Sequence, residues 1–259
     1  IAEGKIKVTV AVAELKASYT AEDIRLKAEK HGENYVLNGS KSFVPDAGEA
    51  DYIIGAARTG ENEEDITLFI VPADISGLST EPMKTVSGEK LDVVYFTDVT
   101  VEAGNRLGEA GRGWQTVETV MQRANVALCA GMAGLARKAL DLALEYAKER
   151  IAFDHPIGAF QSIQHRCADM LIDVDGSRFA TYQAAWKLTE GLPAEKEVAI
   201  AKAWVSKACK RVMHSAHQVH GAIGFSEEHV LHYYIKLARA YEAGFGGPDY
   251  HLARLVRLS

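Results

Sequence analysis

The chain has 259 residues, 25% of them charged, and a formal net charge of −6, values that are ordinary for a soluble globular protein. The negative balance argues against nucleic-acid binding, and no apolar run approaches the roughly 18 residues of a membrane span. No secretory leader is predicted either. Three cysteines, each within an apolar helical pattern, indicate reduced core thiols and a cytoplasmic protein.

The first hundred residues alternate apolar and polar side chains with a period of two, which predicts β-strands. Asn38-Gly39 marks the clearest hairpin, because this pair readily adopts the positive φ angles of a tight turn. Short strands without intervening helices predict an antiparallel β-barrel or sandwich over residues 1–105. The expected strands are Val8–Glu14, Ile24–Lys30, Asn34–Leu37, Ser42–Val44, Tyr52–Ala57, Ile66–Val71 and Val93–Phe96.

From Gly113 onward, apolar residues recur every three or four positions, which predicts long helices. The first has an expected inward face of Val117, Val120, Ala124, Leu128, Gly131, Leu135, Ala139, Leu142 and Tyr146. A second runs from about Ala159 to Thr189, a third follows Gly191-Leu192-Pro193, and a fourth spans Glu228 to about Phe245. The expected inward residues of the third are Val198, Ala201, Val205, Ala208, Val212 and Val219. Four helices with short loops predict an up-and-down bundle over residues 110–259, and an α+β multidomain protein.

The predicted helices are longer than one small domain needs. A helix of about 30 residues spans about 45 Å. Spare apolar surface on such helices usually packs on another subunit, so we expect an oligomer.

Two junctions between the predicted helices carry polar residues. Arg150 and Phe153 precede a Pro-Gly break and Gln161, and a second break, Gln218–Gly224, ends the third helix. Helix punctuation explains Arg150 and the first glycine of the second break, but neither the two glutamines nor the second glycine. Side-chain amides at helix ends suit pyrophosphate and ribose. The junctions therefore predict a site for a ligand with phosphates and flat rings.

The common catalytic and nucleotide-binding motifs are absent. The sequence contains no GxSxG, no P-loop, no GxGxxG after a strand and no CxxC, so a nucleotide cofactor would need a non-Rossmann site. His214, His217 and His220 recur at steps of three, but no Asp or Glu completes a ligand set. We therefore expect no metal site.

With these residues in view, the chain resembles the acyl-CoA dehydrogenase family over nearly its whole length. The resemblance implies FAD at a subunit interface, desaturation of an acyl-CoA thioester with hydride transfer to the flavin, and a homo- or heterotetramer built on the C-terminal helices. It leaves the acyl group and the electron acceptor, a flavoprotein or oxygen, open. Its motifs are Tyr35–Lys41, Leu68–Pro72, Leu107-Gly108 with Gly111–Trp114, RIAFDHPIGAFQ from Arg150, and QVHGAIGF from Gln218.

The first junction corresponds to FAD-binding residues of the family. By resemblance, Arg150 and Phe153 meet the adenylate and pyrophosphate of a neighbouring subunit's FAD, with Gln161 nearby. Asp154 replaces the glycine that usually follows the aromatic residue. Its carboxylate would repel the pyrophosphate unless Arg150 or His155 offsets the charge.

Five further positions are implied by the same resemblance. Gln218, Gly221 and Ala222 would line the adenosine side of the cofactor, and Gly246 would lie near the flavin end. Phe43-Val44-Pro45 stands where the family usually has Trp-Ile-Thr. Phe43 can still cover the flavin ring, but the proline has no N–H and no hydroxyl, so one contact with flavin N5 is lost.

The expected catalytic carboxylate is missing from both family positions, which hold Phe245 and Ala124. Glu242, one helical turn before Phe245, is the candidate base, and a surface acid near Arg239 is the alternative interpretation. Two functions stay open: a divergent dehydrogenase, or a non-catalytic partner subunit that completes the FAD site of a heteromeric enzyme. In a third, structural interpretation the junctions are helix punctuation alone.

The family's N-terminal helical domain has no counterpart in these 259 residues. We expect either that the chain is part of a longer polypeptide or that another chain supplies this domain. Because the domain walls the acyl pocket in the family, the chain alone is expected to bind acyl-CoA poorly.

Overall fold

The computed structural model describes residues 1–258, and the fold is mixed α+β, as predicted. Contacts divide the chain into two compact units, residues 1–120 and the residues from Met121 onward. The division falls inside the first long helix, α1 (Gly113–Glu149), whereas the predicted boundary lies between residues 105 and 110. Within the described residues, none of the helices combines the length and the apolar character of a membrane span.

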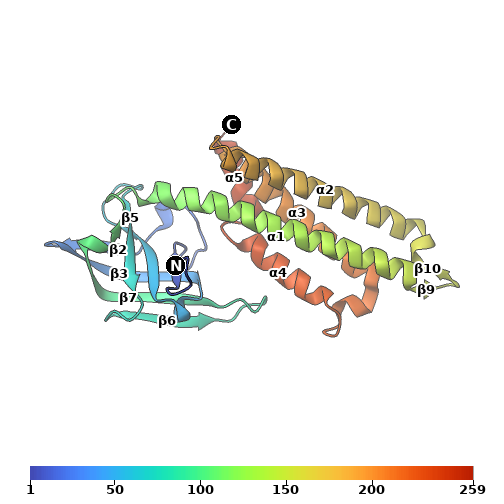
Figure 1. Cartoon of the computed structure of the whole chain (residues 1–259), viewed down its shortest axis with the longest axis horizontal. Helices are drawn as coiled ribbons and strands as arrows, with labels where there is room; N and C mark the ends of the chain where they lie inside the picture. Colours follow the sequence, from blue (N-terminus) through green and yellow to red (C-terminus); the bar gives the residue numbers. More distant parts are fainter. Residues whose placement is uncertain (259) are drawn as a thin grey trace. The chain divides into compact units, whose positions relative to one another are not determined.

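The first unit contains one open, mostly antiparallel sheet (Figure 1). Its order is β6–β7–β3–β2–β4–β5–β8, and β1 pairs in parallel with β4. The end strands β6 and β8 do not pair with each other, so the sheet does not close into the barrel that was one of the two predicted architectures. Strand β8 has only two residues, because Gly108 with a φ of 80° turns the chain away. The strands are β1 (Val8–Ala11), β2 (Lys27–His31), β3 (Asn34–Pro45), β4 (Tyr52–Arg58), β5 (Ile66–Pro72), β6 (Leu78–Met83), β7 (Leu91–Glu102) and β8 (Arg106–Leu107).

The predicted hairpin at Asn38-Gly39 is also wrong, because β3 continues through it and pairs with β7 on both sides. Gly39 is needed for a close approach: a Cβ atom there would lie 3.1 Å from the Cα of Leu26. Asn38 exchanges two hydrogen bonds with Asp98, which ties β3 to β7 at this irregularity. The turn between β2 and β3 is at Gly32, whose φ is 63°.

The second unit packs its helices around one hydrophobic core with side chains from α1, α2, α3 and α4. The predicted fourth helix is shorter than expected, because turns occupy residues 226–230 before it and the positive φ of Phe245 and Gly246 ends the helical backbone after it. A 3₁₀ turn (Gly221–Phe225) follows α3, and a fifth helix, which was not predicted, begins at Pro248. All three cysteines are free, and Cys129 and Cys209 lie in this core. The helices are α2 (Gln161–Thr189), α3 (Glu195–His220), α4 (Leu231–Ala243) and α5 (Pro248–Arg257).

The buried face of α1 agrees with the predicted one in part. Two predicted residues, Val117 and Ala139, are buried, and three more pack against the core, namely Leu135, Leu142 and Tyr146. Val120 is exposed, whereas Met121, Cys129 and Met132 are buried. Small and apolar residues cover two adjacent faces of α1, so its periodicity fits both. Packing decides between them, as where Cys209 of α3 donates to the Met132 carbonyl oxygen. The predicted inward residues of α3 are buried, among them Val198, Ala201, Val205 and Val212.

Candidate functional site

A short β-hairpin, with two residues in each strand and two in the turn, joins α1 to α2. Its strands are β9 (Ile151–Ala152) and β10 (His155–Pro156). The turn residues Phe153 and Asp154 have φ angles of 54° and 63°, the backbone that fits a tight hairpin. Neither is glycine, so each holds strain on the order of 1 kcal/mol. Strain of this kind concentrates at functional sites.

The hairpin presents an aromatic ring and a cation to solvent. Phe153 is 88% exposed, and its ring meets that of Phe160 edge-on at 6.2 Å. The Arg150 side chain is exposed and forms no ion pair with any of residues 1–258. Gln161, the first residue of α2, is also exposed. Three groups suited to an anionic ligand with a flat ring therefore lie on one short segment.

Gly158 allows the hairpin to pack closely against the end of α1. A Cβ atom at this position would lie 2.9 Å from the carbonyl oxygen of Ala147, so no larger residue fits without a shift. The Gln164 side chain donates to the Gly158 carbonyl oxygen over 3.0 Å. This close packing fixes the direction of the hairpin relative to α1 and α2.

The second predicted junction ends α3. Gln218 lies in the last turn of the helix and is exposed, as are Gly221 and Ala222. Gly221 has a φ of 64°, and a Cβ atom there would meet nothing within 4 Å. Gly224 differs, because a Cβ atom there would lie 3.0 Å from that of His220. Packing thus explains the second glycine, which the sequence analysis could not assign to helix punctuation.

The two junctions are in contact. Tyr146, in the last turn of α1, stacks on His220, the last residue of α3, with ring centroids 4.7 Å apart. Burial lowers the pKa of His220, which favours the neutral ring. Six of the predicted FAD-binding residues therefore gather at one end of the helical unit, beside β9 and β10 in Figure 1.

The histidines of α3 are used in packing. His217 and His220 each place Nδ1 at 2.8 Å from the carbonyl oxygen four residues earlier. Among residues 1–258, no group of three or more His, Cys, Asp or Glu side chains is arranged to hold a metal ion.

The turn between α4 and α5 lies at the other end of the helical unit (Figure 1). Lys202 of α3 is fully buried and donates to the carbonyl oxygens of Tyr241, Glu242 and Gly244, at 2.7, 3.2 and 2.7 Å. These are unpaired carbonyl groups of a helix C-terminus. Burial lowers the pKa of Lys202 to about 8. The sequence signal, a lysine within the apolar run of α3, was overlooked.

Gly246 follows in this turn and is buried. Its φ is 97°, and a Cβ atom would lie 2.4 Å from the Tyr250 ring, so the position requires glycine. Phe245 also has a positive φ, 52°. Its carbonyl oxygen accepts hydrogen bonds from Asn125 of α1 at 3.5 Å and from His251 of α5 at 3.2 Å. Side chains from two further helices thus hold the turn.

Glu242, the candidate base, lies in the last turn of α4. Its carboxylate forms an ion pair with Arg239 at 2.9 Å and faces a groove of about 120 Å³ between α3 and α4. Lys210 and His214 line the same groove. The neighbouring Arg239 agrees with the surface-acid interpretation of Glu242, but the Glu242 side chain is only 19% exposed.

In the first unit, Phe43 lies at the second irregularity of β3, with a φ of 58° and a half-buried side chain. Two residues earlier, Lys41 is fully buried, forms an ion pair with Glu14 at 2.8 Å and donates to the Val12 carbonyl oxygen at 3.0 Å. Burial lowers the pKa of Lys41 to about 8, against the opposing effect of Glu14. Breaking such a buried pair is costly, so it holds the strand beside Phe43 in place.

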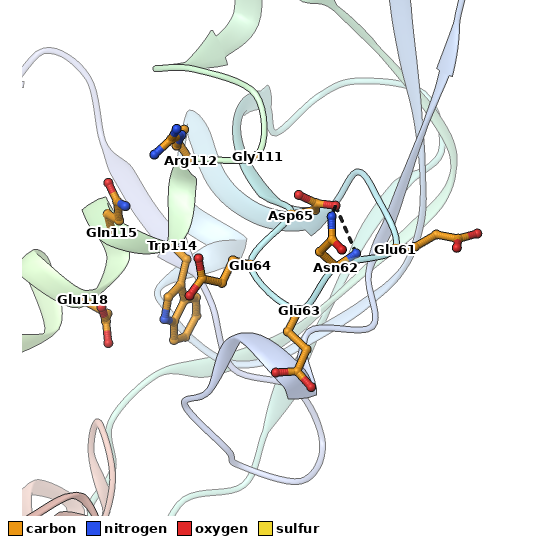
Figure 2. A pocket seen from close by; sticks show the side chains of 10 residues that line it. All are labelled: Glu61, Asn62, Glu63, Glu64, Asp65, Gly111, Arg112, Trp114, Gln115 and Glu118. Atoms are coloured by element: carbon orange, nitrogen blue, oxygen red, sulfur yellow. Dashed lines mark hydrogen bonds between the residues drawn. The ribbon is translucent and has the colours of Figure 1, made fainter. Parts of the chain in front are cut away.

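A separate cavity of about 910 Å³ lies in the first unit and contains none of the predicted site residues (Figure 2). Trp114 and Arg112 share it with five carboxylates, and Asp65 accepts two hydrogen bonds from Asn62. The excess of negative charge would repel phosphate groups. The cavity is therefore a poor candidate for binding a dinucleotide. Its lining is Glu61, Asn62, Glu63, Glu64, Asp65, Gly111, Arg112, Trp114, Gln115 and Glu118.

Two family models match the chain. The one described as acyl-CoA dehydrogenase, C-terminal domain, matches residues 111–258, and the one described as acyl-CoA dehydrogenase, middle domain, matches residues 9–99. Together they cover most of the chain, in the order of its two units.

Similar proteins carry related descriptions. The chain is 33% identical to the probable acyl-CoA dehydrogenase YngJ of Bacillus subtilis, over 99% of the chain and 68% of that protein. It is 31% identical to the caffeyl-CoA reductase-Etf complex subunit CarC of Acetobacterium woodii, over 88% of the chain and 62% of that protein. The structure of butyryl-CoA dehydrogenase from Megasphaera elsdenii matches with a TM-score of 0.93 and 30% identity, covering 99% of this chain and 68% of that one. The chain thus spans about half to two thirds of the length of its curated relatives.

Proposed function

Because this chain belongs to the acyl-CoA dehydrogenase family, we propose that it works in an FAD-dependent enzyme that desaturates an acyl-CoA thioester between its α and β carbons. The observation that carries the proposal is the contact between the two helix junctions. Arg150 and Phe153 belong to one of these junctions and Gln218 to the other, and all three residues are exposed.

The residues at these junctions fit the adenylate and pyrophosphate half of FAD. Arg150 is an exposed cation, able to neutralise a pyrophosphate with charge-assisted hydrogen bonds. Phe153 is exposed enough to cover a flat base. The amides of Gln161 and Gln218 can donate to phosphate or ribose oxygens. The open space around Gly221 allows a ligand to approach the backbone of Gly221 and Ala222 closely.

Phe43 and Gly246 are proposed at the flavin half. FAD, when bound, supplies the acceptor for the hydride that leaves the β-carbon. The Phe43 ring would shield one face from water, and Pro45 leaves that side without a hydroxyl donor. Lys202 and Gln218 are sixteen positions apart, about 24 Å along α3. That distance supports the proposal that the two ends of one helical unit contact the FAD molecules of two neighbouring subunits.

A second function is favoured by the missing carboxylate. Phe245 and Ala124 carry no titratable group, Asn125 beside Ala124 is an amide, and Glu242 is paired with Arg239. A base for α-proton abstraction needs a carboxylate that reaches the substrate and is not held by a cation. These observations favour a non-catalytic partner subunit, which completes the FAD site while a partner chain supplies the carboxylate.

The flavin proposal predicts that Arg150→Ala loses FAD. Removal of the one cation at the hairpin leaves the pyrophosphate charge uncompensated, and loss of a charge-assisted contact weakens binding about tenfold or more. The absorbance near 450 nm after gel filtration, measured on the full-length protein co-expressed with its partner chain, reports the bound flavin. Lys148→Ala, an exposed cation in the last turn of α1, is the control and should retain its yellow colour. A colourless wild-type complex would overturn the proposal.

Glu242→Gln separates the two functions. If Glu242 is the base, turnover of a series of acyl-CoA thioesters by the FAD-loaded complex falls about 100-fold or more, because proton abstraction typically contributes that much. Unchanged turnover removes Glu242 as the base and leaves the partner-subunit function. Glu228→Gln, an exposed acid outside the groove, serves as the matched control.

The proposal extends to assembly, acceptor and compartment. We infer that α1 to α4 form an up-and-down four-helix bundle, supported by their common core, and that this bundle builds the tetramer. The Etf complex named for the Acetobacterium relative supports an electron-transferring flavoprotein as the acceptor. The free cysteines support a reducing compartment such as the cytoplasm.

A further inference from the structure

Two buried hydrogen-bonding atoms beneath the α4–α5 turn have no protein partner. They are Oδ1 of Asn125 on α1 and Nδ1 of His251 on α5, and both residues are only 2% exposed. Both residues line one small cavity between α1, α3 and α5, with about 10 Å³ of water-accessible space. A buried polar atom without a partner is destabilising by about 1–3 kcal/mol, so two at one cavity call for an explanation.

The chemistry of both atoms follows from their neighbours. The Asn125 amide nitrogen donates to the carbonyl oxygens of Met121 and Phe245, which can only accept, so the amide orientation is fixed and Oδ1 is left as an acceptor. His251 Nε2 lies 3.2 Å from the same Phe245 carbonyl oxygen, so Nε2 carries a proton. On a neutral ring Nδ1 is then an acceptor as well.

The cavity therefore fits a very small molecule or ion that donates two hydrogen bonds, one to each acceptor. Its volume matches one water molecule, which requires about 10–15 Å³ of such space and at least two polar partners. An ammonium ion has the same donors, but Glu195, the one carboxylate that lines the cavity, is already paired with Arg254, and buried Lys202 lies near His251, so the charge of a buried ammonium ion would stay uncompensated.

We propose that one buried water molecule bridges Asn125 Oδ1 and His251 Nδ1, donating one hydrogen bond to each. Through this bridge α1 and α5 are joined directly below Phe245, whose carbonyl oxygen both side chains also bind. Lys202 holds the preceding carbonyl groups. The water completes a buried polar clamp on the segment from Tyr241 to Gly246. Only the relevance of this clamp to flavin rests on the proposed function.

The tautomer of His251 tests the proposal on the wild-type protein. In protein labelled with ¹⁵N-histidine, we expect the His251 ring at pH 7.5 to be neutral and protonated at Nε2, with Nδ1 shifted as a hydrogen-bonded acceptor. A crystal structure of the full-length complex should show a density peak within hydrogen-bonding distance of both atoms. A ring protonated at Nδ1, or no peak at this position, overturns the proposal. A peak that only ammonium-containing crystals show overturns the assignment to water.

Asn125→Leu tests the role of the clamp in holding the turn. The variant removes the Oδ1 acceptor together with the direct hydrogen bond to the Phe245 carbonyl oxygen, so the peak should disappear and amide exchange of residues 244–247 should accelerate about tenfold or more, the loss of at least one hydrogen bond. Gln122→Leu, at the same cavity but without an unpartnered buried atom, should keep both the peak and the slow exchange. Equal exchange rates in the two variants would exclude the bridge as a restraint on the turn. None of these readouts requires FAD, so failure here is distinguishable from failure of the proposed function.

Discussion

At the scale of single residues, Asp154 is the residue that fits the proposed FAD site least well. It occupies a left-handed backbone position that glycine would take without strain, and it sets a carboxylate one residue from the aromatic ring proposed to cover the adenine. Among residues 1–258 it has no ion-pair partner. The neighbouring Arg150 cation is proposed to offset its charge.

Replacing Asp154 by glycine should strengthen FAD binding. Removal of a negative charge near the pyrophosphate is worth about 0.5–1 kcal/mol at an exposed site, about twofold to fivefold in Kd. Asp154→Asn removes the charge and retains a side chain that tolerates the left-handed region, so both variants should gain affinity. Kd from flavin-fluorescence titration in low salt measures this gain. If only the glycine variant improved, strain rather than charge would be responsible.

At the scale of elements, the turn from α4 to α5 is held more firmly than its loop sequence indicates. Lys202 from α3, Asn125 from α1 and His251 from α5 all bind backbone groups of this one segment. The hairpin between α1 and α2 contrasts with it, because its tip residues face solvent. We propose that the firmly held turn between α4 and α5 lies at the flavin, and that the exposed hairpin lies at the adenylate of the neighbouring subunit's FAD.

His251 makes the packing of α5 sensitive to acid. Burial, with help from Lys202, lowers the pKa of His251 to about 4, against about 6.5 in the unfolded chain. Between these values the unfolded state binds more protons, so stability is complete above pH 6.5 and is lost as the pH falls toward 4. The full contribution is about 3 kcal/mol.

Urea unfolding of wild type and His251→Leu at pH 7.5 and 4.5 checks this prediction. The variant should lose about 2–3 kcal/mol less than wild type on acidification, since it lacks the titrating ring. His165→Leu, an exposed histidine on α2, should lose as much as wild type. Equal losses in all three proteins would contradict the lowered pKa.

At the scale of the whole molecule, α2 carries an exposed aromatic face. Phe179, Tyr182 and Trp186 are each more than half exposed, and the Arg178 guanidinium lies over the first two rings at 5.5 and 5.8 Å. Monomeric proteins seldom leave contiguous aromatic surface uncovered. This face supports the proposed packing of subunits.

We expect Phe179→Glu combined with Trp186→Glu to dissociate the assembly. Charges introduced at a buried apolar interface cannot be desolvated without loss of binding energy, so sedimentation velocity should show a smaller species at micromolar concentration. Lys138→Glu, an exposed residue of α1, should sediment as wild type. A wild-type protein that is monomeric throughout would refute the tetramer.

Some local patterns in this sequence predict the structure correctly, and others do not. Val198, Ala201 and Val205 were predicted correctly, because α3 is apolar on only one face. The inward face of α1 was predicted only in part, because its small residues permit two orientations. Asn38-Gly39 suggested a hairpin, yet the close approach of Leu26 makes Gly39 part of a continuous strand. Lys202 escaped notice, because the carbonyl groups that it caps lie about forty residues away in the sequence.

The family, the succession of strands and then helices, and the two junctions proposed to bind FAD can all be inferred from the amino-acid sequence, because periodicity and short motifs are local properties of the chain. Tertiary structure alone decided that the sheet is open, that Tyr146 stacks on His220, that Glu242 pairs with Arg239, and that Asn125 and His251 share a cavity. Each of these depends on which distant side chains meet, and that is settled only when apolar faces pack and buried polar atoms find partners.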